Sequence, residues 1–114
     1  MPYIRTTVSK PLTDENKESL KAKLGEAIAL IPGKSEAWLM LSFEDNCRIW
    51  FKGDNSLPCA FCEVQVLGKI NPEDSEKLSA EICSIFEAEL GIPQDRTYIK
   101  YEEIDQWGWN GGNF

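Results

Sequence analysis

The chain has 114 residues, with 12 lysines and arginines against 19 aspartates and glutamates, a net charge of −7, four cysteines and no histidine. This length predicts one domain over residues 1–114, and the negative charge argues against binding of nucleic acid or an anionic membrane surface, since both need a basic field. The lack of histidine excludes serine–histidine triads, cysteine–histidine pairs and histidine metal sites. Acid–base chemistry near neutral pH must therefore use a cysteine, a carboxylate or lysine of shifted pKa, or the terminal amine.

The first half of the chain predicts a strand, a helix and two further strands. Residues 2–9, rich in Tyr, Ile, Thr and Val, predict a strand that starts almost at the first residue. Thr13 is a suitable helix N-cap before an acidic first turn, and Pro32-Gly33 is expected to end that helix. Residues 37–44 predict a buried strand, and residues 48–51 predict a second, short strand. The expected apolar face of the helix consists of Leu20, Leu24, Ala27, Ile28 and Ile31.

The second half predicts the same kind of elements. Residues 60–67 alternate as a strand, and Asn71-Pro72 is a capped helix start with proline at the first helical position. Gly91 is expected to end that helix, and residues 97–102 predict the last long strand. Residues 106–114, which contain two tryptophans, are too apolar for a solvated tail and are expected to dock on their own subunit or on a neighbour. The apolar face expected for the second helix consists of Leu78, Ile82, Ile85, Phe86 and Leu90.

Both halves therefore run strand, helix, strand. This order predicts an α/β (α+β) fold of two βαβ units side by side, with both helices on one face of the sheet. The halves share no sequence identity that would demonstrate a duplication. A chain of this size has a thin core, which makes association with copies of itself a plausible supplement.

Cysteine content and the lack of a long apolar run favour a reduced, cytoplasmic location. No stretch of 18 apolar residues and no secretion signal is found, and four cysteines are too few for a disulfide scaffold. Cys59 and Cys62 form a CxxC pair that could cycle between dithiol and disulfide, but positions 59 and 62 of a regular strand point to opposite faces. Cys47 and Cys83 are predicted to be structural, and no cysteine spacing typical of zinc is present, so no metal or cofactor is expected.

Several short motifs occur together in a characteristic order. They are Met1-Pro2, Gly33-Lys34, Pro58-Cys59-Ala60-Phe61-Cys62, Leu67-Gly68-Lys69-Ile70, Asp95-Arg96-Thr97-Tyr98-Ile99, and Gly108-Trp109-Asn110 near the terminal Phe114. Through these motifs the chain resembles the macrophage migration inhibitory factor family of the tautomerase superfamily over essentially its whole length.

The resemblance implies a fold, an assembly and an activity. Each subunit would hold a four-stranded mixed sheet with two helices on one face, and subunits would form homotrimers in which short strands extend a neighbour's sheet. The activity would be keto–enol tautomerisation of phenylpyruvate-like 2-oxo acids, with a dopachrome-type isomerase activity and no cofactor. The site would lie between subunits, with a small aromatic keto acid as substrate.

The resemblance also implies that Pro2 is the catalytic base once Met1 has been removed. Proline is small enough for such removal, which leaves a secondary amine at the terminus. An amine buried in an apolar pocket beside other cations has a lowered pKa and is neutral at physiological pH. Without the resemblance, Pro2 would be interpreted only as the first residue of a strand, where a missing N–H costs nothing.

Further site residues follow from the resemblance alone. Lys34 would hold the substrate carboxylate and stabilise enolate charge, the backbone of Leu67 would bind the same carboxylate, and Tyr98 would enter from the adjoining subunit. The aromatic wall of the pocket would consist of Tyr3, Trp38, Trp107, Trp109 and Phe114. The alternatives are an ordinary exposed lysine at position 34 and simple packing for the tyrosines, tryptophans and phenylalanine.

The chain departs from the animal members of that family at two places. Lys100 stands where they carry asparagine, and a second ammonium near the pocket mouth would further lower the pKa of the proline and favour dianionic substrates. The segment between Tyr98 and Trp109 is also shorter, by roughly two residues, which changes the expected pocket shape.

Two other functions remain open from the sequence. Because animal members of the family act as cytokines and several parasites release copies, the chain could be a secreted signalling or host-modulating protein that binds a cell-surface receptor, released without a signal peptide. It could also be a trimeric protein that retains the site but makes little use of it.

Overall fold

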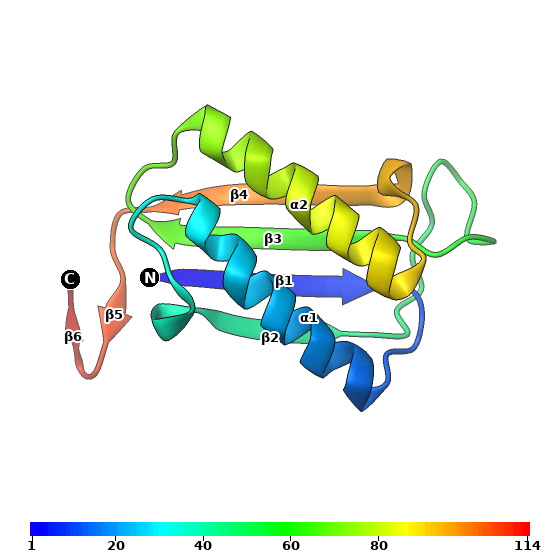
Figure 1. The fold of residues 1–114 in the computed structure, drawn as a ribbon, viewed down its shortest axis with the longest axis horizontal. Helices are drawn as coiled ribbons and strands as arrows, with labels where there is room; N and C mark the ends of the chain where they lie inside the picture. Colours follow the sequence, from blue (N-terminus) through cyan, green and yellow to red (C-terminus); the bar gives the residue numbers. More distant parts are fainter.

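The computed structural model describes all residues from Met1 to Phe114 as one layer of helices packed on one sheet (Figure 1). The helices are α1 (Asp14–Ala27) and α2 (Pro72–Leu90), and single 3₁₀ turns cover Ile28–Leu30, Glu36–Trp38 and Gln94–Arg96. The strands are β1 (Pro2–Val8), β2 (Met40–Glu44), β3 (Ala60–Leu67), β4 (Thr97–Ile104), β5 (Gly108–Trp109) and β6 (Gly112–Asn113). Neither helix is long and apolar enough to cross a membrane.

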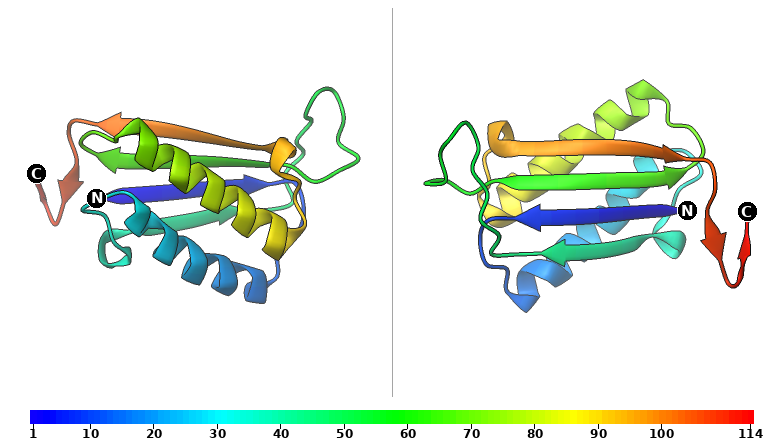
Figure 2. Two further views of the ribbon diagram at one scale, coloured as in Figure 1. Left: turned by 45° about the horizontal axis from the view of Figure 1, so that its top comes forward. Right: turned by 180° about the vertical axis from the view of Figure 1, so that it is seen from behind.

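The main sheet has the strand order β2-β1-β3-β4. β1 pairs parallel with β2, and the crossover connection between them contains α1. β3 pairs parallel with β4 in the same way, with α2 in the connection. The two βαβ units join where β1 and β3 pair antiparallel. Both helices cover the same face (Figures 1 and 2), so the prediction of two βαβ units in a mixed four-stranded sheet is confirmed.

The core lies between the helices and this face of the sheet. Alternate residues of β1 and β3 point into it, as the period of a strand requires. α2 contributes its predicted apolar face, with Phe86 fully buried at its centre. Eighteen buried residues form one hydrophobic cluster, so the fold has a single core that supports the sheet from one side.

Substituting Phe86→Ala is expected to lower the free energy of unfolding by about 3–5 kcal/mol, because it deletes a fully buried aromatic ring and leaves a cavity. Urea unfolding at fixed protein concentration measures this change, since an oligomer's stability depends on concentration. A loss below about 1 kcal/mol would mean that the region around α2 repacks freely.

The start of α1 and both ends of α2 follow the sequence, whereas α1 ends at Ala27 and a 3₁₀ turn over Ile28–Leu30 precedes the predicted stop at Pro32-Gly33. The Thr13 hydroxyl accepts the backbone N–H of Asn16, and the Asn16 side chain accepts the N–H of Thr13, which completes a capping box. Asn71 caps α2 by accepting the N–H of Glu73. Gly91 ends α2 with φ of 66°, in the left-handed region where glycine is favoured.

Two predicted strands are wrong in part. Residues 48–51 form no strand; the loop that contains them makes only an isolated bridge between Phe51 and Asp54, because no edge of this chain's sheet lies beside it. The predicted strand 37–44 begins as a 3₁₀ turn, and strand pairing starts only at Met40, a residue that is 69% exposed. β2 is an edge strand with one uncovered face, so it is not the buried strand that its apolar residues suggested.

The second face of the sheet carries no helix (Figure 2, right). A row of paired charges crosses it from β2 to β4. Arg5 pairs with Glu44 and Glu63, and Lys100 pairs with Glu63 and Glu102. These side chains are partly exposed, so each pair contributes little to stability, but together they neutralise most of the charge on this face.

Candidate active site

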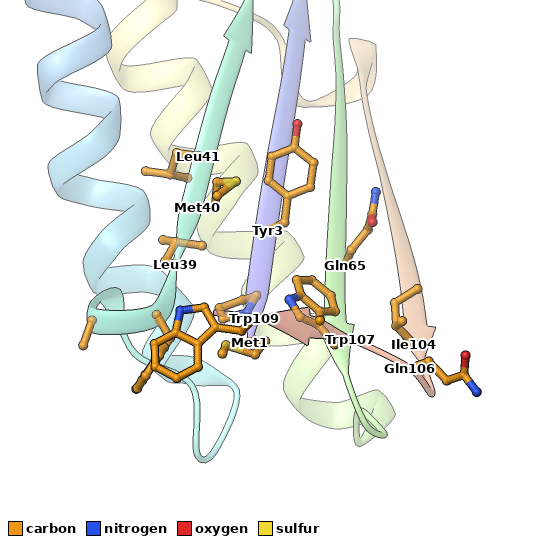
Figure 3. Close-up of a pocket in the computed structure, with 14 residues that line it drawn as sticks. Met1, Tyr3, Leu39, Met40, Leu41, Gln65, Ile104, Gln106, Trp107 and Trp109 are labelled. Atoms are coloured by element: carbon orange, nitrogen blue, oxygen red, sulfur yellow. The ribbon is translucent and has the colours of Figure 1, made fainter. Parts of the chain in front are cut away.

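A depression of about 990 Å³ lies at the end of the sheet where the chain begins (Figure 3). Its walls come from the start of β1, the turn that leads into β2, β3, the end of β4, and the C-terminal segment. Ten of its fourteen lining residues are hydrophobic and none carries a charged side chain. The hollow therefore suits an apolar body such as an aromatic ring, with any charged group held at its edge.

The first two residues sit inside this depression. Pro2 is buried and pairs with Val66 across the antiparallel β1–β3 ladder. The carbonyl oxygen of Met1 accepts a 3.0 Å hydrogen bond from the N–H of Leu67. The end of β3 thus holds the start of the chain in place.

Lys34 approaches the Met1 amine from the turn after α1, although it is not one of the residues that line the depression. Gly33, with φ of 82°, reverses the chain just before it. The Lys34 ammonium then donates a 2.9 Å hydrogen bond to the carbonyl oxygen of Leu67. The backbone N–H of Leu67 is therefore bonded to Met1, and its carbonyl oxygen is bonded to Lys34.

The terminal amine of the chain has a lowered pKa. Burial disfavours the charged amine most, and the positive charge of Lys34 and a hydrogen bond with its side chain lower the pKa further. A terminal amine at this end of β1 thus loses its proton more readily than an exposed one. The arrangement provides a weakly basic, more often neutral nitrogen beside a fixed ammonium.

Aromatic rings surround this polar centre. Trp38 and Trp109 meet edge to face with centroids 5.0 Å apart, and the Trp109 ring stacks on Phe114 at 6.0 Å. Tyr3 lies on the uncovered face of the sheet and its hydroxyl bonds to Ser42 at 2.7 Å. Four of the five predicted aromatic residues, including Trp107, line the depression, while Phe114 reaches it only through Trp109.

Several lining residues were not predicted. Gln65 on β3 and Met40 on β2 are the strand partners of Tyr3 and present their side chains to the same face (Figure 3). Leu39 and Ile104 complete the apolar wall. The sequence pattern of a strand shows which of its own residues share a face, but it does not show which residues of other strands lie beside them. Only the pairing register brings these residues from three strands together.

Tyr98 and Lys100 lie away from the depression of their own chain. Tyr98 pairs with Phe61 at the start of β4, six residues before Ile104, a separation of about 20 Å along the strand. Its side chain is 60% exposed on the uncovered face. The Lys100 ammonium is bound by Glu102 at 2.8 Å and Glu63 at 3.1 Å, and these carboxylates raise its pKa. Lys100 remains charged within these pairs, and the role expected for it near the pocket mouth stays a prediction.

The cysteines show no sign of a redox centre. All four are free thiols. Cys62 faces the core beside Thr6, and burial raises the pKa of its thiol to about 12, so it holds almost no thiolate at neutral pH. Cys59 lies buried just before β3, with its sulfur 3.3 Å from the Arg96 guanidinium and hydrogen-bonded to loop carbonyls. The redox hypothesis gains no geometric support.

No group of three or more histidine, cysteine, aspartate or glutamate side chains lies close enough together to hold a metal ion.

Comparison with known proteins agrees with this arrangement. A family model described as "Macrophage migration inhibitory factor (MIF)" matches residues 1–114. The macrophage migration inhibitory factor of Xenopus laevis is 30% identical over 113 residues, covering 97% of this chain and 95% of that one. The macrophage migration inhibitory factor homolog of Trichinella spiralis is 34% identical, and the alignment covers 100% of both chains.

A solved structure extends the likeness to three dimensions. The crystal structure of Leishmania major MIF2 superimposes with a TM-score of 0.92 at 33% identity, covering 100% of this chain and 97% of that one. The family model, the two relatives and this structure each span at least 97% of the chain. The chain therefore belongs to the macrophage migration inhibitory factor family of the tautomerase superfamily.

Proposed function

We propose that the protein is a cofactor-independent keto–enol tautomerase of phenylpyruvate-like 2-oxo acids, with a related dopachrome-type isomerase activity. The observation that carries this proposal is the lowered pKa of the terminal amine beside Lys34 in an apolar depression. A neutral amine accepts a proton from carbon, and a neighbouring ammonium stabilises the charge that then develops on oxygen.

Removal of Met1 would convert this end of the chain into the working site. Met1 occupies part of the depression, and its loss leaves the secondary amine of Pro2 as the terminus. Pro2 lies in the same depression at the same end of β1, so burial and the Lys34 charge, which lower the pKa of the Met1 amine, are proposed to act on its amine in the same direction. Loss of Met1 also frees the N–H of Leu67 from its only partner in the chain, and that N–H becomes a donor for an incoming carboxylate.

The proposed reaction moves one proton within the substrate. The Pro2 amine takes a proton from the carbon next to the ketone, and the electron pair of that C–H bond forms the enolate. The protonated amine then donates the proton to the enolate oxygen, which gives the enol and restores the neutral base. Lys34 spends one of its three N–H donors on Leu67, so two remain for the carboxylate and the enolate oxygen.

Three copies of the chain would complete the site. The uncovered face of the sheet, the exposed side chains of Met40 and Tyr98, and the unpaired segment 48–51 favour contact with further copies. Because Tyr98 lies at the far end of the sheet from Pro2, it would serve the site of a neighbour. We propose a homotrimer with sites between subunits, in keeping with the family.

Ultraviolet measurement of phenylpyruvate enol-to-keto conversion tests the proposal. The purified protein, with loss of Met1 verified by mass spectrometry, should accelerate conversion well above the uncatalysed rate, and sedimentation should give a trimer. A Pro2→Gly variant, which keeps a terminal amine but changes its basicity and rigidity, should be slower. A trimer that lacks Met1 and shows no acceleration would refute the enzymatic function.

A further inference from the structure

The loop between β2 and β3 lies at the end of the sheet opposite the two chain termini (Figure 1). Three side chains, Arg96, Phe51 and Tyr98, form a column there. The Arg96 guanidinium lies 5.5 Å from the centroid of the Phe51 ring. The Phe51 ring meets the Tyr98 ring edge to face, with centroids 5.2 Å apart and an angle of 80°. Arg96, Phe51 and Tyr98 thus form a continuous column of contacts from the buried arginine to the exposed tyrosine.

Arg96 fixes the loop that carries Phe51. Its side chain is almost completely buried and donates hydrogen bonds to the carbonyl oxygens of Asp54, Leu57 and Pro58. A planar guanidinium presents its donors in a fixed fork, so these carbonyls are held in one arrangement. The loop has no ladder of strand hydrogen bonds, so the Arg96 bonds add to the few backbone bonds that tie it to the rest of the chain, such as that from the N–H of Cys47 to the carbonyl oxygen of Val8.

Phe51 is held within that loop by its own backbone. Its N–H donates to the Asp54 carbonyl at 2.9 Å, and its carbonyl accepts the N–H of Asp54 at 3.0 Å. The same Asp54 carbonyl accepts from Arg96, so one oxygen links the clamp to the ring-bearing residue. The position of the Phe51 ring therefore depends on Arg96 in two ways, through the contact of the guanidinium with the ring and through the hydrogen bond to the Asp54 carbonyl oxygen.

We infer that Phe51 and Arg96 are positioning residues for Tyr98, which they hold in the orientation needed at the neighbouring subunit's site. The inference rests on the proposed function. Tyr98 is 60% exposed at the start of its strand, so the Phe51 edge is a main restraint on its ring within the chain. A contact of this kind changes a rotamer equilibrium by up to about tenfold.

A double-mutant cycle on the assembled protein tests the kinetic role of this column. Phe51→Leu keeps the apolar bulk but removes the aromatic edge, and Arg96→Lys keeps the charge but removes the fork. Each should lower kcat/KM for phenylpyruvate by about 3- to 10-fold. Combining either with Tyr98→Phe, which removes the hydroxyl, should add little to the loss from Tyr98→Phe alone, because positioning matters only while that hydroxyl is present. Losses that simply multiply would overturn the inference.

Fluorine NMR of protein labelled with 3-fluorotyrosine gives a second readout that needs no activity. The chain has three tyrosines, and Tyr98→Phe identifies the resonance of Tyr98. Phe51→Leu should move that resonance toward the position of free fluorotyrosine and leave those of Tyr3 and Tyr101 in place. Trp50→Leu, a change of the adjacent exposed ring outside the column, should leave it unmoved.

The two measurements separate this inference from the proposed function. A wild-type protein without turnover would refute the tautomerase proposal, and the fluorine shift would then decide alone whether Phe51 holds Tyr98. An unmoved Tyr98 resonance in Phe51→Leu would overturn the positioning role even in an active enzyme.

Discussion

Insertion of one alanine between Met1 and Pro2 is expected to reduce phenylpyruvate turnover by about 10²–10⁴-fold, the contribution of a positioned general base, while the fold is unchanged. In this variant the nitrogen of Pro2 becomes part of a peptide bond and loses its basicity. The new terminal amine lies one residue before the Pro2 nitrogen, so it is displaced from the position proposed for the base.

The matched control keeps an amine in place. Pro2→Ala permits removal of Met1 and leaves a primary amine at the same position, so its kcat/KM should fall between those of the wild type and the insertion variant. Circular dichroism and sedimentation should be the same for all three proteins. An insertion variant with wild-type kcat/KM would show that the terminal amine is not the base.

Substitution of Lys34→Met is expected to lower kcat/KM by about 10- to 100-fold. In a plot of kcat/KM against pH, the limb that rises with pH should also move to higher pH. The loss follows from removal of a charged donor to the substrate carboxylate. The direction of the pH shift follows from electrostatics: the Lys34 charge lowers the pKa of the terminal amine, so its removal raises that pKa. A higher pKa means that the neutral base appears only at higher pH.

A pH series of kcat/KM for the wild type and the variant measures both effects. Lys21→Met is a suitable control, because it removes a lysine charge from an exposed helix position that pairs only with Glu18. That control should leave the profile unchanged. A rising limb that stays in place or moves to lower pH in Lys34→Met would contradict the proposed electrostatic role.

Local chemistry made the elements and their order predictable. Thr13, Asn71 and Gly91 act at helix ends through their own side chains or backbone freedom, and the structure has all three in those roles. The alternation of residues 60–67 likewise predicted a strand, and alternate residues of β3 are buried in the structure. Such features depend on residues close together in the chain, so they can be inferred without knowing the tertiary structure.

Features that depend on contacts between distant segments could not be predicted in the same way. The ion pair between Lys100 and Glu63 joins two strands, and only the β3–β4 register places these residues together. Gln65 was missed for the same reason. Residues 48–51 have the composition of a strand but no partner edge within this chain.

The resemblance supplied what residue patterns could not. Pro2 alone is only a proline at the start of a strand, and nothing near it in the sequence indicates a base. The structure adds a physical reason to consider it, because Lys34 and Leu67, distant in sequence, meet at this end of β1. The roles of Tyr98 and the aromatic wall remain predictions from the resemblance.

The most direct test of the central claim is a titration of the Pro2 amine itself. Protein labelled with ¹⁵N-proline and lacking Met1 would be followed by NMR as a function of pH, beside the pH profile of kcat/KM. We expect the terminal amine to titrate well below its ordinary pKa, at the same pH as the rising limb of the profile. An amine that titrates at its ordinary value, or a rising limb that does not follow it, would contradict the assignment of Pro2 as the base.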